Sequence, residues 1–289
     1  NKFLLIVQFN IVLFLLNFRN PLIWVTSPAA RDIVLYLKKR CKKCVYYCCD
    51  NLAHFPGVDK EYIERLETDI QKNSDISFFV NNQLMEERKA VTRVSRHTEH
   101  GVDYEHFAQC LDKKLPIPDD IKNIKTPIVG YMGEIQSLDL DLIVYLAKKE
   151  PNFSFVFVGE VYTAVSDIAL PSNVYFFGKR AYDLLPNYLQ MFACCCLYYK
   201  MDDIFNKYRN PKKLMEYLAT GKPVISVGII QMKAFKDYVY IAENYEEFHA
   251  CLVQAVSKTN PVQIEKCRMF AQQHTWDNVA LRIMQNIIR

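Results

Sequence analysis

The chain has 289 residues, of which 51% are hydrophobic and 24% charged, and its formal net charge is +4 at pH 7. This length accommodates two domains of ordinary size, and the composition is that of a globular rather than a disordered protein. The basic excess is small, and no stripe of Arg and Lys interleaves with aromatic residues, so we predict no nucleic-acid partner.

The ten cysteines are predicted to be reduced rather than paired in disulfides. Residues 48–49 and 194–196 lie in apolar runs, where a free cysteine behaves as a small hydrophobic residue. Cys41 and Cys44 have the spacing of a zinc knuckle or a redox pair, but no second pair follows at zinc-finger spacing. We therefore expect neither a metal nor a cofactor, and reduced thiols indicate the cytoplasm.

Residues 3–18 form an apolar run that predicts a buried helix. Gln8, Asn10 and Asn17 interrupt the run, and it falls short of the ~20 residues that a membrane-spanning helix requires. The chain has no initiator methionine and begins inside this predicted helix. We therefore expect a fragment that lacks N-terminal sequence.

Strands and helices alternate up to residue 100, which is typical of a parallel α/β sheet. The helices begin near Ser27 and at Asp59, which is a predicted N-cap. The predicted strands cover residues 21–25, 44–49 and 76–80. A complete Rossmann-like domain would carry more strands, which again favours missing N-terminal sequence.

Basic residues gather where the helix that begins near Ser27 ends: Lys38, Lys39, Arg40, Lys42 and Lys43. The interpretation that we favour is stabilisation of the helix C-terminus together with a solvated face. Contact with lipid headgroups is the alternative.

Residues 100–120 are predicted to link the first domain (1–117) to the second (118–274). Gly101 permits a positive φ, and a loop rich in Asp, Glu and Pro follows. His100 and His106 could suggest a metal or catalytic pair. They share one loop and lack a third ligand, so we do not assign them to a site.

The second domain carries predicted strands at residues 127–132, 153–158, 173–177 and 194–199. Glycines end the first three strands, at positions 133, 159 and 178. Open α/β sheets bind their ligands at the carboxyl ends of the strands, so this edge is the predicted binding site. Asp139 and Asp141 match the sequence of a metal-binding D-x-D motif. They lie at the start of a predicted helix, however, and the better explanation is that their carboxylates compensate its dipole.

Residues 210–226 combine a helix start, a helix stop and a strand. Asn210 is a predicted N-cap, Pro211 fits the first helical position, and Gly221 ends the helix. Such a helix start attracts anions, and Lys213 adds a positive charge to it. Glu216 could accept hydrogen bonds from a pair of sugar hydroxyls. A plain helix-to-strand connection is the alternative.

This stretch resembles the donor-binding motif of retaining glycosyltransferases of family 4, which reads close to N-P-x-K-x-x-E-Y-L-A-x-G-K-P-V. The bacterial enzymes of cell-surface polysaccharide and teichuronic acid synthesis are the most similar subgroup. The resemblance extends from about residue 21 to the end of the chain and includes H-G-V-D-x-x-x-F after residue 99 and V-G-Y-M-G-E after residue 128.

The resemblance implies an α/β fold of the GT-B type, with two Rossmann-like domains facing across a cleft. The first domain would be incomplete and lie on the acceptor side. Residues 118–274 would bind the nucleotide-sugar, and a C-terminal helix, residues 275–289, would cross back to the first domain.

The implied activity is the transfer of a sugar, with retention of configuration, from a nucleoside diphosphate sugar to a saccharide or lipid-linked acceptor. In the family, the glutamate that matches Glu216 holds the ribose, and the helix start faces the diphosphate. Asp50 is the candidate for the acceptor side, and a helix-capping role is its alternative. The candidate donor-binding residues are Gly133, Glu134, Gly178, Lys179, Arg180, Asn210, Lys213 and Glu216.

Two positions depart from the family. The Arg and Lys pair that many members carry after the first strand of the second domain is absent here, and Tyr208 replaces a glutamate. Stabilisation of the diphosphate would then fall to Lys213, to the amides after Asn210 and to the backbone at Gly133.

Two other functions remain open. One is an inactive or truncated relative that binds a nucleotide or a partner without transfer, and the other, ranked last, is an epimerase of the same fold. For the transferase we expect a cytoplasmic location, with peripheral contact at the inner membrane face as an alternative.

Overall fold

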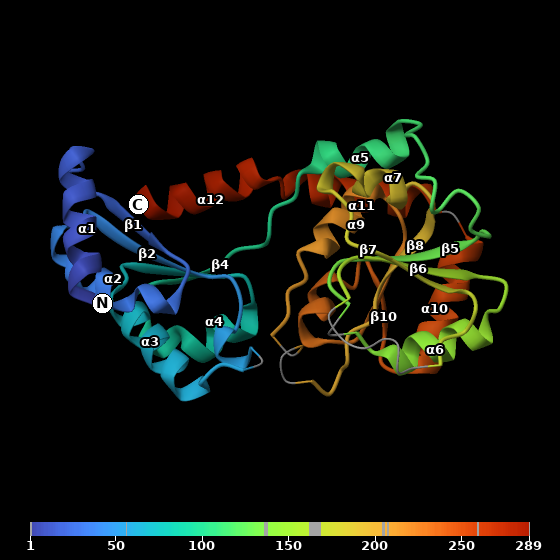
Figure 1. Ribbon diagram of the computed structural model, residues 1–289, viewed down its shortest axis with the longest axis horizontal. Coiled ribbons are helices and arrows are strands. Elements are labelled where there is room, and N and C mark those ends of the chain that lie inside the picture. Colours follow the sequence, from blue (N-terminus) through green and yellow to red (C-terminus); the bar gives the residue numbers. More distant parts are fainter. Residues whose placement is uncertain are drawn as a thin grey trace. The chain divides into compact units, whose positions relative to one another are not determined.

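The computed structural model describes residues 2–55, 57–135, 138–161, 169–203, 206, 208–258 and 260–288. The chain forms two compact units, each built on a parallel sheet (Figure 1). The first unit holds Asn1–Glu99, Tyr208–Asn210 and Leu281–Arg289, and the second holds His100–Lys207 and Pro211–Ala280. The N-terminal segment of the first unit ends at Glu99, and residues 100–117, expected in the first domain, lie in the second unit.

The sheet of the first unit has the strand order β1-β2-β3-β4, and every neighbouring pair is parallel. The alternation of strand and helix expected from the sequence is confirmed. The strands are β1 (Leu22–Val25), β2 (Lys43–Cys48), β3 (Ile76–Phe79) and β4 (Ser95–His97). The helices are α1 (Lys2–Leu15), α2 (Arg31–Leu37), α3 (Lys60–Asn73), α4 (Asn82–Arg88) and the end of α12 (Trp276–Ile288).

Helix α1 forms as expected, but the prediction that it is buried is wrong. Its apolar side chains are largely exposed; Phe14, for example, is 83% exposed. The helix carries its own apolar side chains on all sides, so no single apolar stripe selects one face for burial. A polar contact ties it to α2, since Asn10 Nδ2 donates to the Tyr36 hydroxyl at 2.9 Å. No helix among the described residues is long and apolar enough to span a membrane.

A buried ion pair lies between α3 and α4 in the first unit. Glu67 is 1% exposed, and its Oε2 lies 3.4 Å from Arg88 Nη2. Its other oxygen accepts from the Tyr46 hydroxyl at 2.6 Å and from the Cys48 thiol at 3.4 Å. Because Glu67 is surrounded by protein, loss of the guanidinium would leave its charge without compensation.

The Arg88→Ala variant is therefore expected to lose about 3 kcal/mol of unfolding free energy. Urea denaturation followed by circular dichroism measures this loss. The matched control is Arg93→Ala, because the Arg93 side chain is 65% exposed in its pair with Asp75. Its replacement should lower the unfolding free energy by less than about 1 kcal/mol. Equal losses in the two variants would contradict the prediction.

The sheet of the second unit has the strand order β10-β9-β8-β5-β6-β7, again parallel throughout. Strands β5 and β6 are buried along their full length, which explains their nearly continuous apolar sequences. The strands are β5 (Ile128–Met132), β6 (Ser154–Val158), β7 (Val174–Gly178), β8 (Phe192–Leu197), β9 (Val224–Val227) and β10 (Tyr240–Ala242).

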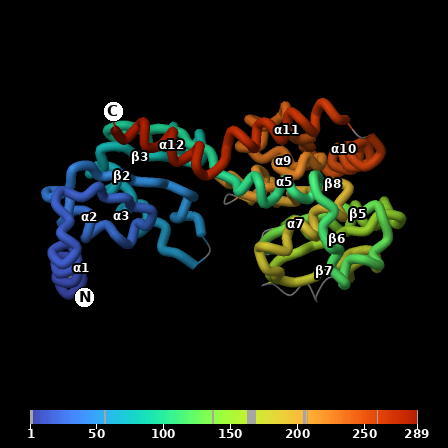
Figure 2. The backbone as a smooth tube through the Cα atoms, turned by 90° about the horizontal axis from the view of Figure 1, so that it is seen from above, coloured from blue at the N-terminus to red at the C-terminus, as the bar shows by residue number. Residues whose placement is uncertain are grey.

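Helices cover both faces of this sheet (Figure 1). One face carries α5 (Tyr104–Asp112), α7 (Leu185–Leu189), α9 (Lys213–Thr220) and α11 (Pro261–Gln273). The other face carries α6 (Leu140–Lys149) and α10 (Tyr245–Ser257). Helix α9 lies between α5 and α11 (Figure 2) and also contacts strand β9 of the sheet. Packing on three sides therefore fixes the residues at the start of this helix.

The cysteine prediction agrees with the structure. All ten cysteines lie within the described residues and carry free thiols. Cys194, Cys195 and Cys196 are completely buried in β8. Burial raises the pKa of the Cys195 thiol well above its ordinary value, so this thiol stays protonated and packs as an apolar group.

Candidate functional site

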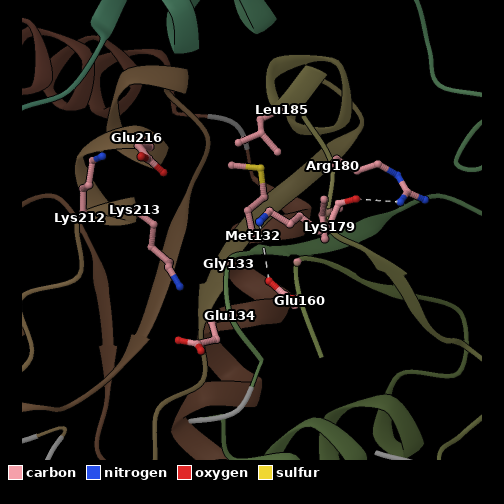
Figure 3. A pocket seen from close by; sticks show the side chains of 12 residues that line it. Met132, Gly133, Glu134, Glu160, Lys179, Arg180, Leu185, Lys212, Lys213 and Glu216 are labelled. Atoms are coloured by element: carbon pink, nitrogen blue, oxygen red, sulfur yellow. Dashed lines mark hydrogen bonds and ion pairs between the residues drawn. The ribbon is translucent and has the colours of Figure 1, made fainter. Parts of the chain in front are cut away.

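A pocket of about 470 Å³ lies at the carboxyl ends of β5, β6 and β7 (Figure 3), and all its lining residues belong to the second unit. The volume is within the range of small-molecule sites. The pocket occupies the sheet edge where open α/β folds bind ligands. Its lining residues are Met132, Gly133, Glu134, Val158, Gly159, Glu160, Lys179, Arg180, Leu185, Lys212, Lys213 and Glu216.

Backbone atoms of Gly133 and Gly159 form the floor of the pocket, the surface at the ends of β5 and β6. The Gly133 amide donates to the Val158 carbonyl at 2.9 Å, and the Gly159 amide donates to the Gly178 carbonyl at 2.9 Å. A Cβ on Gly159 would lie 2.6 Å from the carbonyl carbon of Gly133. The two strand ends can approach this closely only because Gly159 lacks a side chain. The Gly133 amide already bonds within the sheet, and the contribution of the Gly133 backbone to diphosphate binding stays a prediction.

Lys213 is the first residue of α9, and its ammonium meets the end of β5. Its Nζ donates to the Tyr131 hydroxyl at 2.5 Å and lies 4.3 Å from the centroid of the Tyr131 ring. The sequence had placed Lys213 at an anion-attracting helix start, and the structure brings that start to the pocket.

Glu216 projects from α9 one turn after Lys212 and Lys213 (Figure 3). Burial raises the pKa of its carboxyl, while the charges of Lys212, Lys213 and His106 act in the opposite direction. The nearby lysines therefore compensate only part of the cost of burying this charge. Lys212 is a pocket residue that the sequence motif alone did not single out, although its place beside Lys213 at the helix start was a signal for it.

Asn210 does not cap α9, so this prediction was wrong. The helix begins at Lys213 after a turn in which the Pro211 carbonyl accepts from the Leu214 amide at 2.9 Å. Asn210 instead lies in the first unit, where its Nδ2 donates to the Val80 carbonyl at 2.6 Å. The side chain thus satisfies the Val80 carbonyl just after β3, and Lys212 occupies the N-cap position of the helix.

The two basic residues after β7 differ in their contacts. The Arg180 guanidinium bonds to Asp120 at 2.7 Å and to the Tyr188 hydroxyl at 2.9 Å, and these bonds raise its pKa. Figure 3 shows this guanidinium directed away from the other side chains of the pocket. Lys179 is exposed, with its Nζ 3.8 Å from Glu160 Oε2. Arg180 therefore holds the loop together, and Lys179 presents a charge to solvent.

The remaining candidates lie elsewhere. Gly178, the last residue of β7, is not among the residues that line the pocket. Asp50 lies in the first unit after β2, where burial raises the pKa of its carboxyl and the Asn51 amide donates to it at 2.8 Å. Its helix-capping alternative is wrong, because the short helix at Leu52–His54 follows Asn51 without a side-chain cap bond. The acceptor-side role of Asp50 stays a prediction.

The residues considered as metal ligands have structural roles or partners of their own. Asp139 lies at a helix start, as predicted, and caps α6 by accepting from the Leu142 amide at 3.1 Å. His106 stacks on Tyr182 with ring centroids 4.6 Å apart. Within the part of the chain that the structure describes, no group of three or more His, Cys, Asp or Glu side chains could hold a metal ion.

Comparison with known proteins gives one relative in sequence and several in fold. No family model matches the chain. The chain is 30% identical over 151 residues to TuaH of Bacillus subtilis (strain 168), whose given name is that of a teichuronic acid biosynthesis glycosyltransferase. This match covers 50% of the chain but only 37% of TuaH.

Two solved structures show the same fold over most of the chain. HepE of Anabaena, solved in complex with UDP, has a TM-score of 0.71 at 13% identity and covers 92% of this chain and 78% of its own. The trehalose-6-phosphate synthase OtsA has a TM-score of 0.71 at 11% identity and covers 100% and 76%. These matches confirm the GT-B type of α/β fold.

Proposed function

We propose that the chain is a glycosyltransferase that transfers a sugar, with retention of configuration, from a nucleoside diphosphate sugar to a saccharide or lipid-linked acceptor of the cell envelope. The observation that carries the proposal is the pocket at the strand ends, where Lys212, Lys213 and Glu216 come together at the start of α9. The sequence similarity to TuaH supports this reaction class, and HepE, of the same fold, was solved with UDP.

The chemistry of these side chains suits a nucleotide-sugar. An ionised Glu216 can accept hydrogen bonds from two adjacent ribose hydroxyls. Lys213, Lys212 and the start of α9 offer positive charge to the diphosphate, whose negative charge grows as the anomeric bond breaks. The glycine floor lets the ligand approach the backbone closely.

A second candidate is a relative that binds the nucleotide without transfer. The observation that favours it is Glu134, an acidic residue in the pocket where many family members carry a basic pair. A carboxylate there repels a diphosphate and weakens the stabilisation of a leaving group.

Calorimetric titration with UDP, followed by a turnover assay with a panel of UDP-sugars, tests the proposal. The Lys213→Ala variant is expected to bind UDP about 10- to 100-fold more weakly, because it loses a charged hydrogen-bond donor, and to bind uridine equally well. Lys148→Ala, at an exposed position in the last turn of α6, is the matched control.

The outcomes separate the candidates. No UDP binding by the wild type would refute the donor site. UDP binding with neither transfer nor hydrolysis across the panel would favour the second candidate. Release of UDP from one donor, with the anomeric configuration of the product read by NMR, would establish the transferase and its stereochemistry.

A further inference from the structure

We propose that Tyr131 is a positioning residue that holds the ammonium group of Lys213 in place for the diphosphate. The proposal rests on the proposed function, because it explains how one lysine is prepared for an anion at that site. Tyr131 does not line the pocket and acts through Lys213.

Two directed hydrogen bonds join Lys213 to the loop after β5. Lys213 Nζ donates to the Tyr131 hydroxyl at 2.5 Å, and the Tyr131 hydroxyl donates to the Glu134 carbonyl at 2.8 Å. Because the phenol gives its single proton to the carbonyl, its lone pairs face the ammonium. The ring adds a cation–π contact, since its centroid lies 4.3 Å from Nζ.

The position of the phenol is set by the core of the second unit. Tyr131 is completely buried in β5, and its ring centroid lies 6.0 Å from that of Phe157 and 6.4 Å from that of Tyr198. A side chain packed in this way has one conformation. The hydroxyl is therefore a fixed point for a lysine that otherwise samples many rotamers.

Helix α9 is attached to the same strand a second time. Tyr217, four residues after Lys213, accepts from the Met132 amide at 2.7 Å. Residues four apart lie on the same face of a helix, so Lys213 and Tyr217 together align α9 against consecutive residues of β5. Gly133 fits this arrangement, because a Cβ there would run into the end of the Lys213 side chain.

Ordering a long lysine side chain costs conformational entropy. A lysine that is held before the ligand arrives does not incur this cost on binding, which is the usual benefit of preorganisation. Removal of the Tyr131 hydroxyl should thus weaken the binding of the diphosphate and leave that of the nucleoside unchanged.

The experiment compares wild type, Tyr131→Phe and Tyr245→Phe. Tyr245→Phe is the matched control, because it removes a hydroxyl bonded to the Asp139 carboxylate at 2.9 Å, outside the pocket lining. UDP and uridine are titrated by calorimetry. In protein labelled with ¹⁵N-lysine, NMR detects ammonium groups whose protons exchange slowly, and the Lys213 signal is assigned by its loss in Lys213→Gln.

We expect Tyr131→Phe to bind UDP about 5- to 20-fold more weakly, to bind uridine equally well, and to lose the slowly exchanging Lys213 signal. Tyr245→Phe should match the wild type in all three measurements. Tyr131→Phe that retains both the Lys213 signal and the UDP affinity of the wild type would overturn the positioning role while leaving the proposed function intact. A wild type that binds no UDP would overturn both.

Discussion

Replacement of Glu216 by alanine is expected to abolish turnover of the sugar donor and to weaken UDP binding about 100-fold or more, with the fold intact. The carboxylate is the acidic group of α9 in the pocket, and its loss would remove two charge-assisted hydrogen bonds to the ribose. Calorimetry and the release of UDP from the donor measure the two effects. Glu265→Ala, an exposed change on α11, is the control, and unchanged turnover in Glu216→Ala would refute the proposed role.

The same residue should be unfavourable for stability at neutral pH. Burial raises the pKa of Glu216 in the folded protein, so the carboxyl contributes stability when it is protonated. This contribution is present below the unfolded-state pKa and is lost as the pH rises through the folded-state pKa. Glu216→Gln should therefore gain unfolding free energy over the wild type near neutral pH, and the gain should shrink towards acid pH. Urea denaturation of both proteins across this pH range measures the difference. A gain in stability for Glu216→Gln that appears only at acid pH would contradict the prediction.

Gly159→Ala is expected to destabilise the second unit by about 2 to 3 kcal/mol and to abolish UDP binding. The added Cβ would overlap the Gly133 carbonyl group, which is backbone and cannot rotate away. The ends of β5 and β6 would have to separate, and the floor of the pocket would move with them. Urea denaturation and calorimetry with UDP give the two values.

Gly57→Ala is the control for this effect. Gly57 has a φ of +79°, and a Cβ there would meet no atom within 4 Å, so only the backbone conformation is penalised. That penalty is about 1 kcal/mol. If the two alanine variants lose the same free energy, the close approach of the strand ends is not what selects glycine at position 159.

The sequence was sufficient to predict most strands of both sheets because these are short apolar runs ended by glycine or polar residues, whereas β4 has the polar sequence Ser-Arg-His. In β5 and β6 every residue is buried, so the apolar pattern alone marks them. The same punctuation located the pocket, since parallel strands end at one sheet edge and Lys213 and Glu216 begin the helix beside it.

Contacts distant in sequence could not be predicted. Asn210 was expected to cap the next helix, but α9 begins later, after Lys212, and the Asn210 amide donates to the Val80 carbonyl, 130 residues away in sequence. Arg180 lines the pocket, but its guanidinium pairs with Asp120, 60 residues earlier. The local sequence indicates which hydrogen bonds a side chain can make, whereas the fold determines which partner lies close enough to form one. The exposure of α1 has the same origin, because uniform apolarity does not specify which neighbours a helix meets.

The glycine floor has a consequence for redesign of this pocket. Because Gly133 and Gly159 present backbone to the pocket just after β5 and β6, these two positions offer an engineer no side chain to exchange. Glu134, Glu160 and Lys179 are instead exposed at the edge of the pocket, where substitutions do not disturb the core. Libraries that aim to change which sugar donor is accepted should therefore vary these three positions and leave both glycines untouched.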